Sequence, residues 1–100
     1  MRLNLRGLGF TYYTKLVGEK MKEFRLEFEE LTGFIVGWQA TGKNEHGYEY
    51  SVVQHRMSYG GTQGQYEFAG YDRNGEMDHH SVTGWLTREE ATEMAKNWKG

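Results

Sequence analysis

The sequence predicts an α+β domain in which an antiparallel meander of four to five strands packs against a C-terminal helix. Three observations support this fold class. Glycines punctuate β-rich segments, an Asn-Gly pair at Asn74 and Gly75 separates two strand-like runs, and residues 87–90 form a helix capping box. Because 100 residues suit one hydrophobic core, we expect residues 1–100 to form a single domain.

The first element supports two interpretations. Apolar residues recur at helical spacing at Phe10, Tyr13, Val17, Met21, Phe24, Phe28 and Leu31. Residues 24–29, Phe-Arg-Leu-Glu-Phe-Glu, instead alternate as a strand would. Because Glu, Lys, Met and Leu dominate residues 19–32, we favour a second helix there, within the wider segment 10–32. Gly33 then stands where a helix takes its C-terminal glycine.

Four strands are expected in the middle of the chain. Residues 34–40 and 48–57 have the composition and alternation of strands. Two further strands, at about 65–72 and 76–84, flank the Asn-Gly pair, which suits a type I′ turn because it tolerates positive φ angles.

The last element, residues 87–98, is expected to be a helix. The Thr87 hydroxyl can accept the Glu90 N–H, and the Glu90 carboxylate can reach back. An apolar stripe at Ala91, Met94, Ala95 and Trp98 would face the sheet. The residues predicted to form the core are Phe24, Phe28, Leu31, Phe34, Val36, Trp38, Val52, Phe68, Trp85, Met94 and Trp98.

Composition excludes several classes of protein. The chain has no cysteine, so disulfides, thiol nucleophiles and zinc–thiolate sites are impossible. A formal charge of −2 points neither to a strongly basic nucleic-acid binder nor to an acidic nucleic-acid mimic. The sequence shows no apolar run long enough for a signal peptide or a membrane span, so we expect no membrane partner and a cytoplasmic location.

No set of residues specifies a reaction or a cofactor. Asp78 and His80 would share a strand face that His55 or His46 could join, but polar residues are ordinary on the open face of a sheet. Ser81 and His79 could share a face, yet no nucleophile elbow surrounds the serine. We therefore predict no catalytic residue, no cofactor and no metal site.

Aromatic residues are the strongest functional signal. They gather on the expected sheet, and one or two helices cannot cover both of its faces, so some rings should stay exposed. Exposed Tyr and Trp with Arg are typical of binding surfaces. The candidate partner-binding residues are Trp38, Tyr48, Tyr50, Arg56, Tyr59, Tyr66, Tyr71 and Arg73.

A strand followed by a Thr-x-x-Glu-capped helix, over about residues 71–98, is similar in general style to compact accessory proteins of phages and mobile elements. Many such proteins bind and block a host macromolecule, including defence nucleases. The first hypothesis is therefore a non-catalytic protein-binding inhibitor of a host defence macromolecule, anti-CRISPR-like in action.

Two alternatives stay open. One is a nucleic-acid or small-ligand binding module that uses the sheet aromatics, and the other is an enzyme with an unrecognised site. The expected partner is a protein, and the chain would be a monomer or a homodimer.

Overall fold

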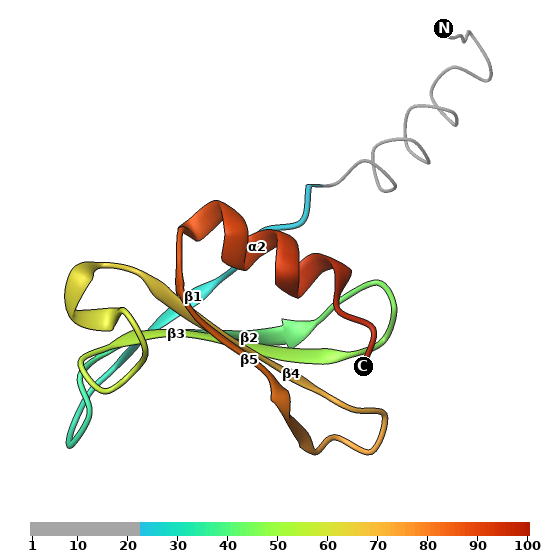
Figure 1. The fold of residues 1–100 in the computed structure, drawn as a ribbon, viewed down its shortest axis with the longest axis horizontal. Helices are drawn as coiled ribbons and strands as arrows, with labels where there is room; N and C mark the ends of the chain where they lie inside the picture. The colour runs from blue at the N-terminus through green and yellow to red at the C-terminus, as the bar shows by residue number, and fades with distance from the viewer. Residues whose placement is uncertain (1–22) are drawn as a thin grey trace, which may run out of the picture.

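The computed structural model describes residues 23–100 and shows five strands and one α-helix (Figure 1). The sheet is an antiparallel meander in which each strand pairs with the next along the chain, in the order β1-β2-β3-β4-β5. The elements are β1 Phe28–Leu31, β2 Gly37–Lys43, β3 Glu49–His55, the 3-10 turn η1 Gly61–Gln63, β4 Tyr66–Tyr71, β5 Met77–Leu86 and α2 Arg88–Asn97. The predicted meander is confirmed.

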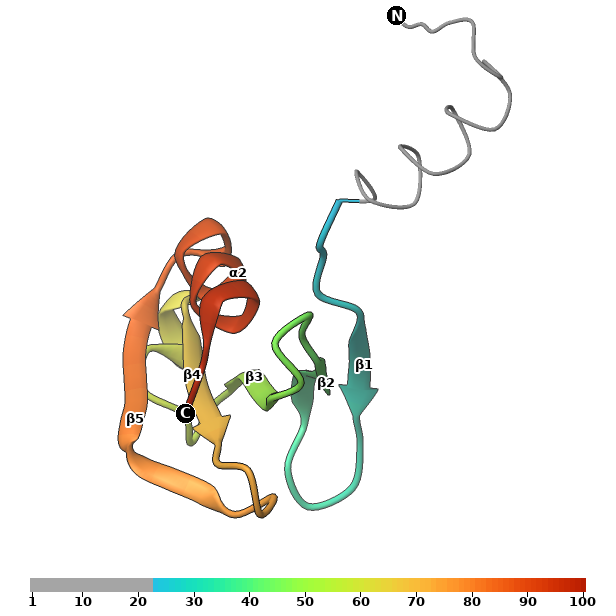
Figure 2. The ribbon, with the colours of Figure 1, turned by 90° about the vertical axis from the view of Figure 1, so that its right-hand side faces the viewer.

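The core lies between α2 and one face of the curved sheet (Figure 2). Phe68 and Val52 are the largest fully buried side chains, and they belong to the neighbouring strands β4 and β3. The helix faces them with Ala91 and Ala95. Two alanines on this face allow the helix backbone to approach the sheet closely, so the aromatic side chains of the strands fill the space between the layers.

The C-terminal helix begins as predicted. The Thr87 Oγ1 accepts the Glu90 N–H at 3.1 Å, and the Glu90 carboxylate accepts the Thr87 N–H at 2.9 Å. This reciprocal capping box satisfies two N–H groups that have no partner within the helix.

No helix of residues 23–100 has the length and apolar composition needed to cross a membrane.

The other end of α2 is fastened by a residue outside the helix. Asn44, in the β2–β3 turn, donates from its Nδ2 to the carbonyls of Ala95 and Trp98, at 2.9 and 2.8 Å. Its Oδ1 accepts the backbone N–H groups of His46 and Tyr48. One buried amide therefore closes the turn and also satisfies two carbonyls at the helix C-terminus, where backbone acceptors lack partners.

The β4–β5 connection lies where the Asn-Gly pair predicted it, but the turn is not of type I′. A type I′ turn needs positive φ at both central residues, whereas among the described residues only Gly75 of this pair has one, at 81°. The Asp72 carboxylate accepts the N–H groups of Asn74 and Glu76, at 2.8 and 3.0 Å. This side-chain cap stabilises the turn with a single positive φ.

The predicted second helix is wrong over residues 23–32, and its remainder, residues 10–22, lies outside the described residues. The segment is extended from residue 23 and continues as β1. Leu26 is buried in the core, and Phe24 and Phe28 pack against it, so the alternating pattern was the correct one. Burial of three alternate side chains outweighs the weak helix preference of the intervening Glu and Arg residues.

The core prediction is confirmed in part. Val52 and Phe68 are fully buried, and Phe24, Phe28, Met94 and Trp98 pack against the core. It is wrong for four residues, because the exposed large apolar side chains include Phe34, Val36, Trp38 and Trp85. Phe34 and Val36 belong to the β1–β2 turn, since β2 begins only at Gly37.

Candidate functional site

The antiparallel order gives the sheet two unlike ends. At one end lie the turn 32–36, the loop 56–65 and the C-terminal end of β5, which we call the long-loop end. At the other end lie the turns 44–48 and 72–76, which we call the short-turn end. Each connection falls at its end because successive antiparallel strands reverse direction.

Exposed apolar side chains gather at the long-loop end. Phe34 is 92% exposed, Met57 67% and Val36 64%, and Trp38, Tyr59 and Trp85 belong to the same end. Only Met77 among the exposed large apolar side chains of the described residues lies at the short-turn end. The four aromatic side chains of the long-loop end are all exposed, from 45% for Trp38 to 92% for Phe34.

A hollow of about 330 Å³ lies within this end. The β1–β2 turn forms one wall with Phe34, Ile35 and Val36, and the start of the β3–β4 loop forms the other with Arg56 and Met57. The hollow could accept one large apolar side chain of a partner, and the Arg56 guanidinium could pair with an acceptor beside it.

Two aromatic rings stack at the same end, one from the β3–β4 loop and one from β5. The Tyr59 and Trp85 ring centroids are 5.2 Å apart with an angle of 28° between the planes. Trp85 has φ 55°, which makes it the one described non-glycine residue in the left-handed region. For a bulky residue this conformation costs on the order of 1–3 kcal/mol, and such strain concentrates at functional sites.

The strained conformation is held by the β3–β4 loop. The Trp85 N–H donates to the Tyr59 carbonyl at 3.1 Å, and the Gln65 amide donates to the Trp85 carbonyl at 3.3 Å. A Cβ on Gly84 would come within 2.2 Å of the Tyr59 Cβ, so only glycine permits this approach. The pairing register of β4 and β5 shifts here, between Tyr66 and Phe68. The irregularity turns the Trp85 side chain out of the regular strand pattern.

The structure divides the eight residues predicted to bind a partner. Trp38, Arg56 and Tyr59 lie at the long-loop end and are exposed. Tyr48 and Arg73 lie at the short-turn end, where the Arg73 Nε donates to the Tyr48 hydroxyl at 2.9 Å. The other three are Tyr50, which is buried in the core, Tyr66, which is half-buried against the Phe28 ring, and Tyr71, which is half-buried at the end of β4.

Sequence reasoning missed Phe34, Val36, Met57 and Trp85 as surface residues. One signal in the sequence could have identified Trp85 as a surface residue, because Gly84 interrupts the strand-like run that precedes the helix. A glycine within a strand pattern often marks a bulge or a close backbone approach, and here it marks both.

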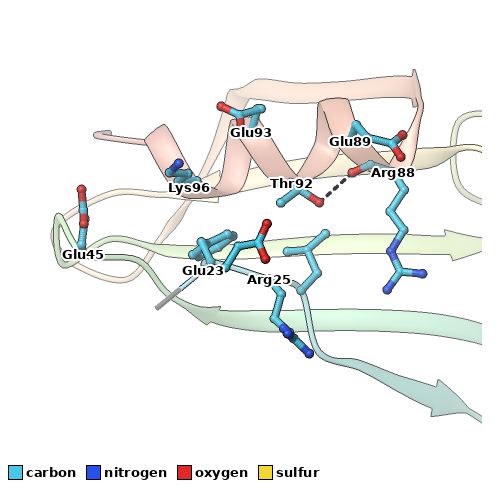
Figure 3. Close-up of a pocket in the computed structure, with 10 residues that line it drawn as sticks. Glu23, Arg25, Glu45, Arg88, Glu89, Thr92, Glu93 and Lys96 are labelled. Carbon is cyan, nitrogen blue, oxygen red and sulfur yellow. Dashed lines mark hydrogen bonds between the residues drawn. The ribbon is translucent and has the colours of Figure 1, made fainter. Parts of the chain in front are cut away.

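A larger groove of about 990 Å³ lies between the extended segment 23–26 and α2 (Figure 3). Figure 3 shows charges of both signs along it, with Glu89 and Glu93 on the helix and Arg25 on the opposite side. The Arg88 guanidinium lies 5.0 Å from the centre of the Phe28 ring, which suits a cation–π contact. Because the described residues begin at Glu23 in the wall of this groove, the groove supports no site by itself.

Within residues 23–100, no three His, Asp or Glu side chains lie close enough to hold a metal ion. The Ser81 hydroxyl donates to the Asp78 carbonyl at 2.6 Å and accepts the Gly70 N–H at 2.8 Å. The Ser58 hydroxyl donates to the His55 carbonyl at 2.7 Å. Ser58 and Ser81 are buried, and both therefore complete backbone hydrogen bonds, in the β3–β4 loop and in β5.

Comparison with models of protein families, with curated proteins and with solved structures finds no match for this chain.

Proposed function

We propose that the chain is a non-catalytic protein-binding module that docks on its partner through the long-loop end. One observation carries the proposal: Phe34, Val36, Trp38, Met57, Tyr59 and Trp85 all stay exposed at this end. Leaving such side chains in water forgoes about 25 cal/mol for each Å² that burial would remove. A partner surface that covers them would recover this free energy.

The composition of the long-loop end fits a protein interface. Aromatic residues, Met and Arg are enriched in interface cores, while Lys and Asp are depleted. The long-loop end combines four aromatic rings and Met57 with the single guanidinium of Arg56. A standard interface buries about 800 Å² on each partner, and this end supplies much of the apolar part of that area.

Nucleic-acid binding fits the described residues less well. A base-stacking sheet needs aromatic rings on an open face, together with cations for the phosphates. Tyr50 is buried and Tyr66 packs against Phe28, so neither ring is free to stack on a base. The Glu67 carboxylate also accepts the Tyr59 N–H, which places negative charge beside the exposed aromatic pair.

The finer proposal is that the module is an accessory protein of a phage or mobile element that blocks a host macromolecule. It rests on the general style of the chain and on the interface-like end described above. The identity of the captured partner tests it, because a partner that is a host enzyme of defence is the expected result.

The proposal is tested by capture with the tagged full chain from a lysate of the host. The binding variant carries Phe34→Ser and Met57→Ser at the long-loop end. The matched control is Met77→Ser, which changes an exposed apolar residue at the short-turn end. We expect the wild type and the control to retain one stoichiometric protein, and the double variant to bind it at least about tenfold more weakly.

Equal capture by all three proteins would contradict the proposal. Recovery of nucleic acid in place of a protein would favour the alternative module. A gel shift that weakens steeply with added salt would then identify phosphate contacts.

A further inference from the structure

The stacked pair of Tyr59 and Trp85 differs from the other aromatic contacts of the described chain. Phe24 packs on Tyr50, Phe28 on Tyr66 and Phe68 on Trp98, and each of these pairs belongs to the core or borders it. Tyr59 and Trp85 are 56% and 55% exposed. Their rings therefore form a ledge whose edges and outer faces meet solvent.

The ledge is built before any partner arrives. Hydrogen bonds fix the backbone of both residues: the Trp85 N–H donates to the Tyr59 carbonyl, and the Gln65 amide donates to the Trp85 carbonyl. The left-handed φ of Trp85 sets the direction of its side chain. A Cβ on Gly84 would collide with the Tyr59 Cβ at 2.2 Å, and one on Gly60 would crowd Trp85 at 3.0–3.1 Å. A rigid aromatic surface loses little conformational entropy on binding, which favours it as a recognition element.

The polar atoms of the ledge indicate what it can bind. The indole N–H of Trp98 donates to the Tyr71 carbonyl at 2.7 Å, whereas no acceptor within residues 23–100 takes a hydrogen bond from the Trp85 indole. An indole N–H is a donor only, and water can satisfy it while Trp85 is exposed, so a ligand that covers the ring must offer an acceptor in place of the water. A polyproline II segment offers such acceptors, because its backbone carbonyls make no internal hydrogen bonds.

The charge beside the ledge further restricts the class of ligand that it can bind. The Glu67 Oε1 accepts the Tyr59 N–H at 3.3 Å, so a carboxylate lies beside the backbone of the pair. This carboxylate would repel the phosphates of a nucleic acid and attract a Lys or Arg of a peptide. Proline rings are compact and apolar and pack on aromatic rings, and the polyproline II conformation is formed in advance.

We propose that Tyr59 and Trp85 bind an extended, proline-containing segment of the partner protein, with a basic residue of that segment near Glu67. The inference rests on the proposed function, because it names the kind of segment that the long-loop end recognises. In the complex, the Trp85 indole N–H donates to a backbone carbonyl of the segment, and proline rings cover the exposed faces of the pair.

The test is a titration of the isotope-labelled full chain, followed through its three indole N–H signals by NMR. The probe is a synthetic oligoproline peptide that ends in arginine, and the control peptide replaces every proline with glycine or serine. We expect the Trp85 signal to shift in a saturable way with the proline peptide alone. The signals of Trp38 and Trp98 should stay in place.

Trp85→Gly is the binding variant, because glycine accepts the left-handed φ and keeps the backbone of the strand end. It should bind the proline peptide at least about tenfold more weakly, measured by calorimetry, while its circular dichroism matches the wild type. Met77→Ser is the matched control, because it changes an exposed apolar residue at the short-turn end, and it should bind as the wild type does.

Three results would each overturn the inference. They are an unmoved Trp85 signal, equal binding of the glycine–serine peptide, and a saturable shift with single-stranded RNA in place of the peptide. The proposed function fails by a different result, which is that the variant with Phe34→Ser and Met57→Ser captures the partner as well as the wild type does. If capture depends on that pair while oligoproline does not bind, the long-loop end still binds a protein and the proline inference alone is wrong.

Discussion

At the short-turn end of the sheet, Trp98 packs edge-on against Phe68 at 5.8 Å, and its indole N–H donates to the Tyr71 carbonyl. At the long-loop end, Trp85 is more than half exposed and holds a left-handed φ. The first indole joins the helix to the sheet, whereas the second is presented to solvent at the expense of backbone strain. The same residue type is therefore packed between helix and sheet at one end and exposed at the other, where we propose that it binds a partner.

The polar residues of the two ends follow the same division. Asn44 links the β2–β3 turn to the C-terminus of α2 through two donated hydrogen bonds. At the long-loop end, Ser58 and Gln65 make hydrogen bonds within the loop and to Trp85, none of which reaches the helix. We infer that the short-turn end fastens the helix to the sheet and that the long-loop end is free to bind.

The largest expected difference comes from removing each indole. Trp98→Ala should lower the free energy of unfolding by about 3 kcal/mol, because it leaves a cavity over Gly70 and Phe68 and removes a hydrogen bond. Trp85→Ala should lower it by about 1 kcal/mol, since it loses only the stacked pair. Urea unfolding of the two variants measures both values. Similar losses would break the comparison between the ends.

The next effect isolates the amide that holds the helix. Asn44→Ala should lower the free energy of unfolding by about 2 kcal/mol, because two helix carbonyls and two turn N–H groups lose their partner. Asn74→Ala is the matched control, an exposed turn residue whose change should stay within about 0.5 kcal/mol. Thermal unfolding followed by circular dichroism compares them, and equal melting temperatures would show that Asn44 does not fasten α2.

A smaller effect reports the backbone strain itself. Both Trp85→Gly and Trp85→Ala remove the ring, but only glycine relaxes at φ 55°. We therefore expect the glycine variant to be more stable than the alanine variant by about 1 kcal/mol, the reverse of the usual order in strands. Urea unfolding under identical conditions decides the sign. A more stable alanine variant would mean that Trp85 carries no strain.

The smallest expected effect on stability comes from Tyr50 and appears only at high pH. Burial raises the pKa of the Tyr50 phenol above its ordinary value of 10.0, and the nearby Glu27 carboxylate raises it further. As the pH rises, Tyr50 therefore loses its proton at a lower pH in the unfolded chain than in the folded chain. This contribution to stability is therefore complete below pH 10.0 and is lost as the pH rises through the folded pKa. Tyr50→Phe should flatten the fall of stability above pH 10.0, as measured by unfolding across that range.

Local signals explain which parts of the fold the sequence predicted. The capping box of Thr87 and Glu90 and the turn around Gly75 depend on neighbouring residues alone, so α2 and the β4–β5 hairpin were found. The start of β1 was missed because helix preference and strand alternation conflict over residues 24–29. Only the burial of Leu26 against the sheet and α2 resolves that conflict, and burial is a tertiary property.

The candidate site was harder to predict for a related reason. Apolar residues such as Phe34 and Val36 were assigned to the core because they continue the alternation of the strand that follows. The strand instead begins at Gly37, after the turn, and this boundary leaves both side chains outside. Tyr59 was named as a binding residue, but its partner Trp85 depends on an irregularity of β5 that the strand pattern alone does not reveal.

The division of labour between the two ends is tested most directly by hydrogen–deuterium exchange of the full chain, alone and with its captured partner. The account predicts that the partner slows exchange of amides in the turn 32–36 and the loop 56–65, and leaves the turns 44–48 and 72–76 unchanged. Protection confined to the short-turn end would contradict it.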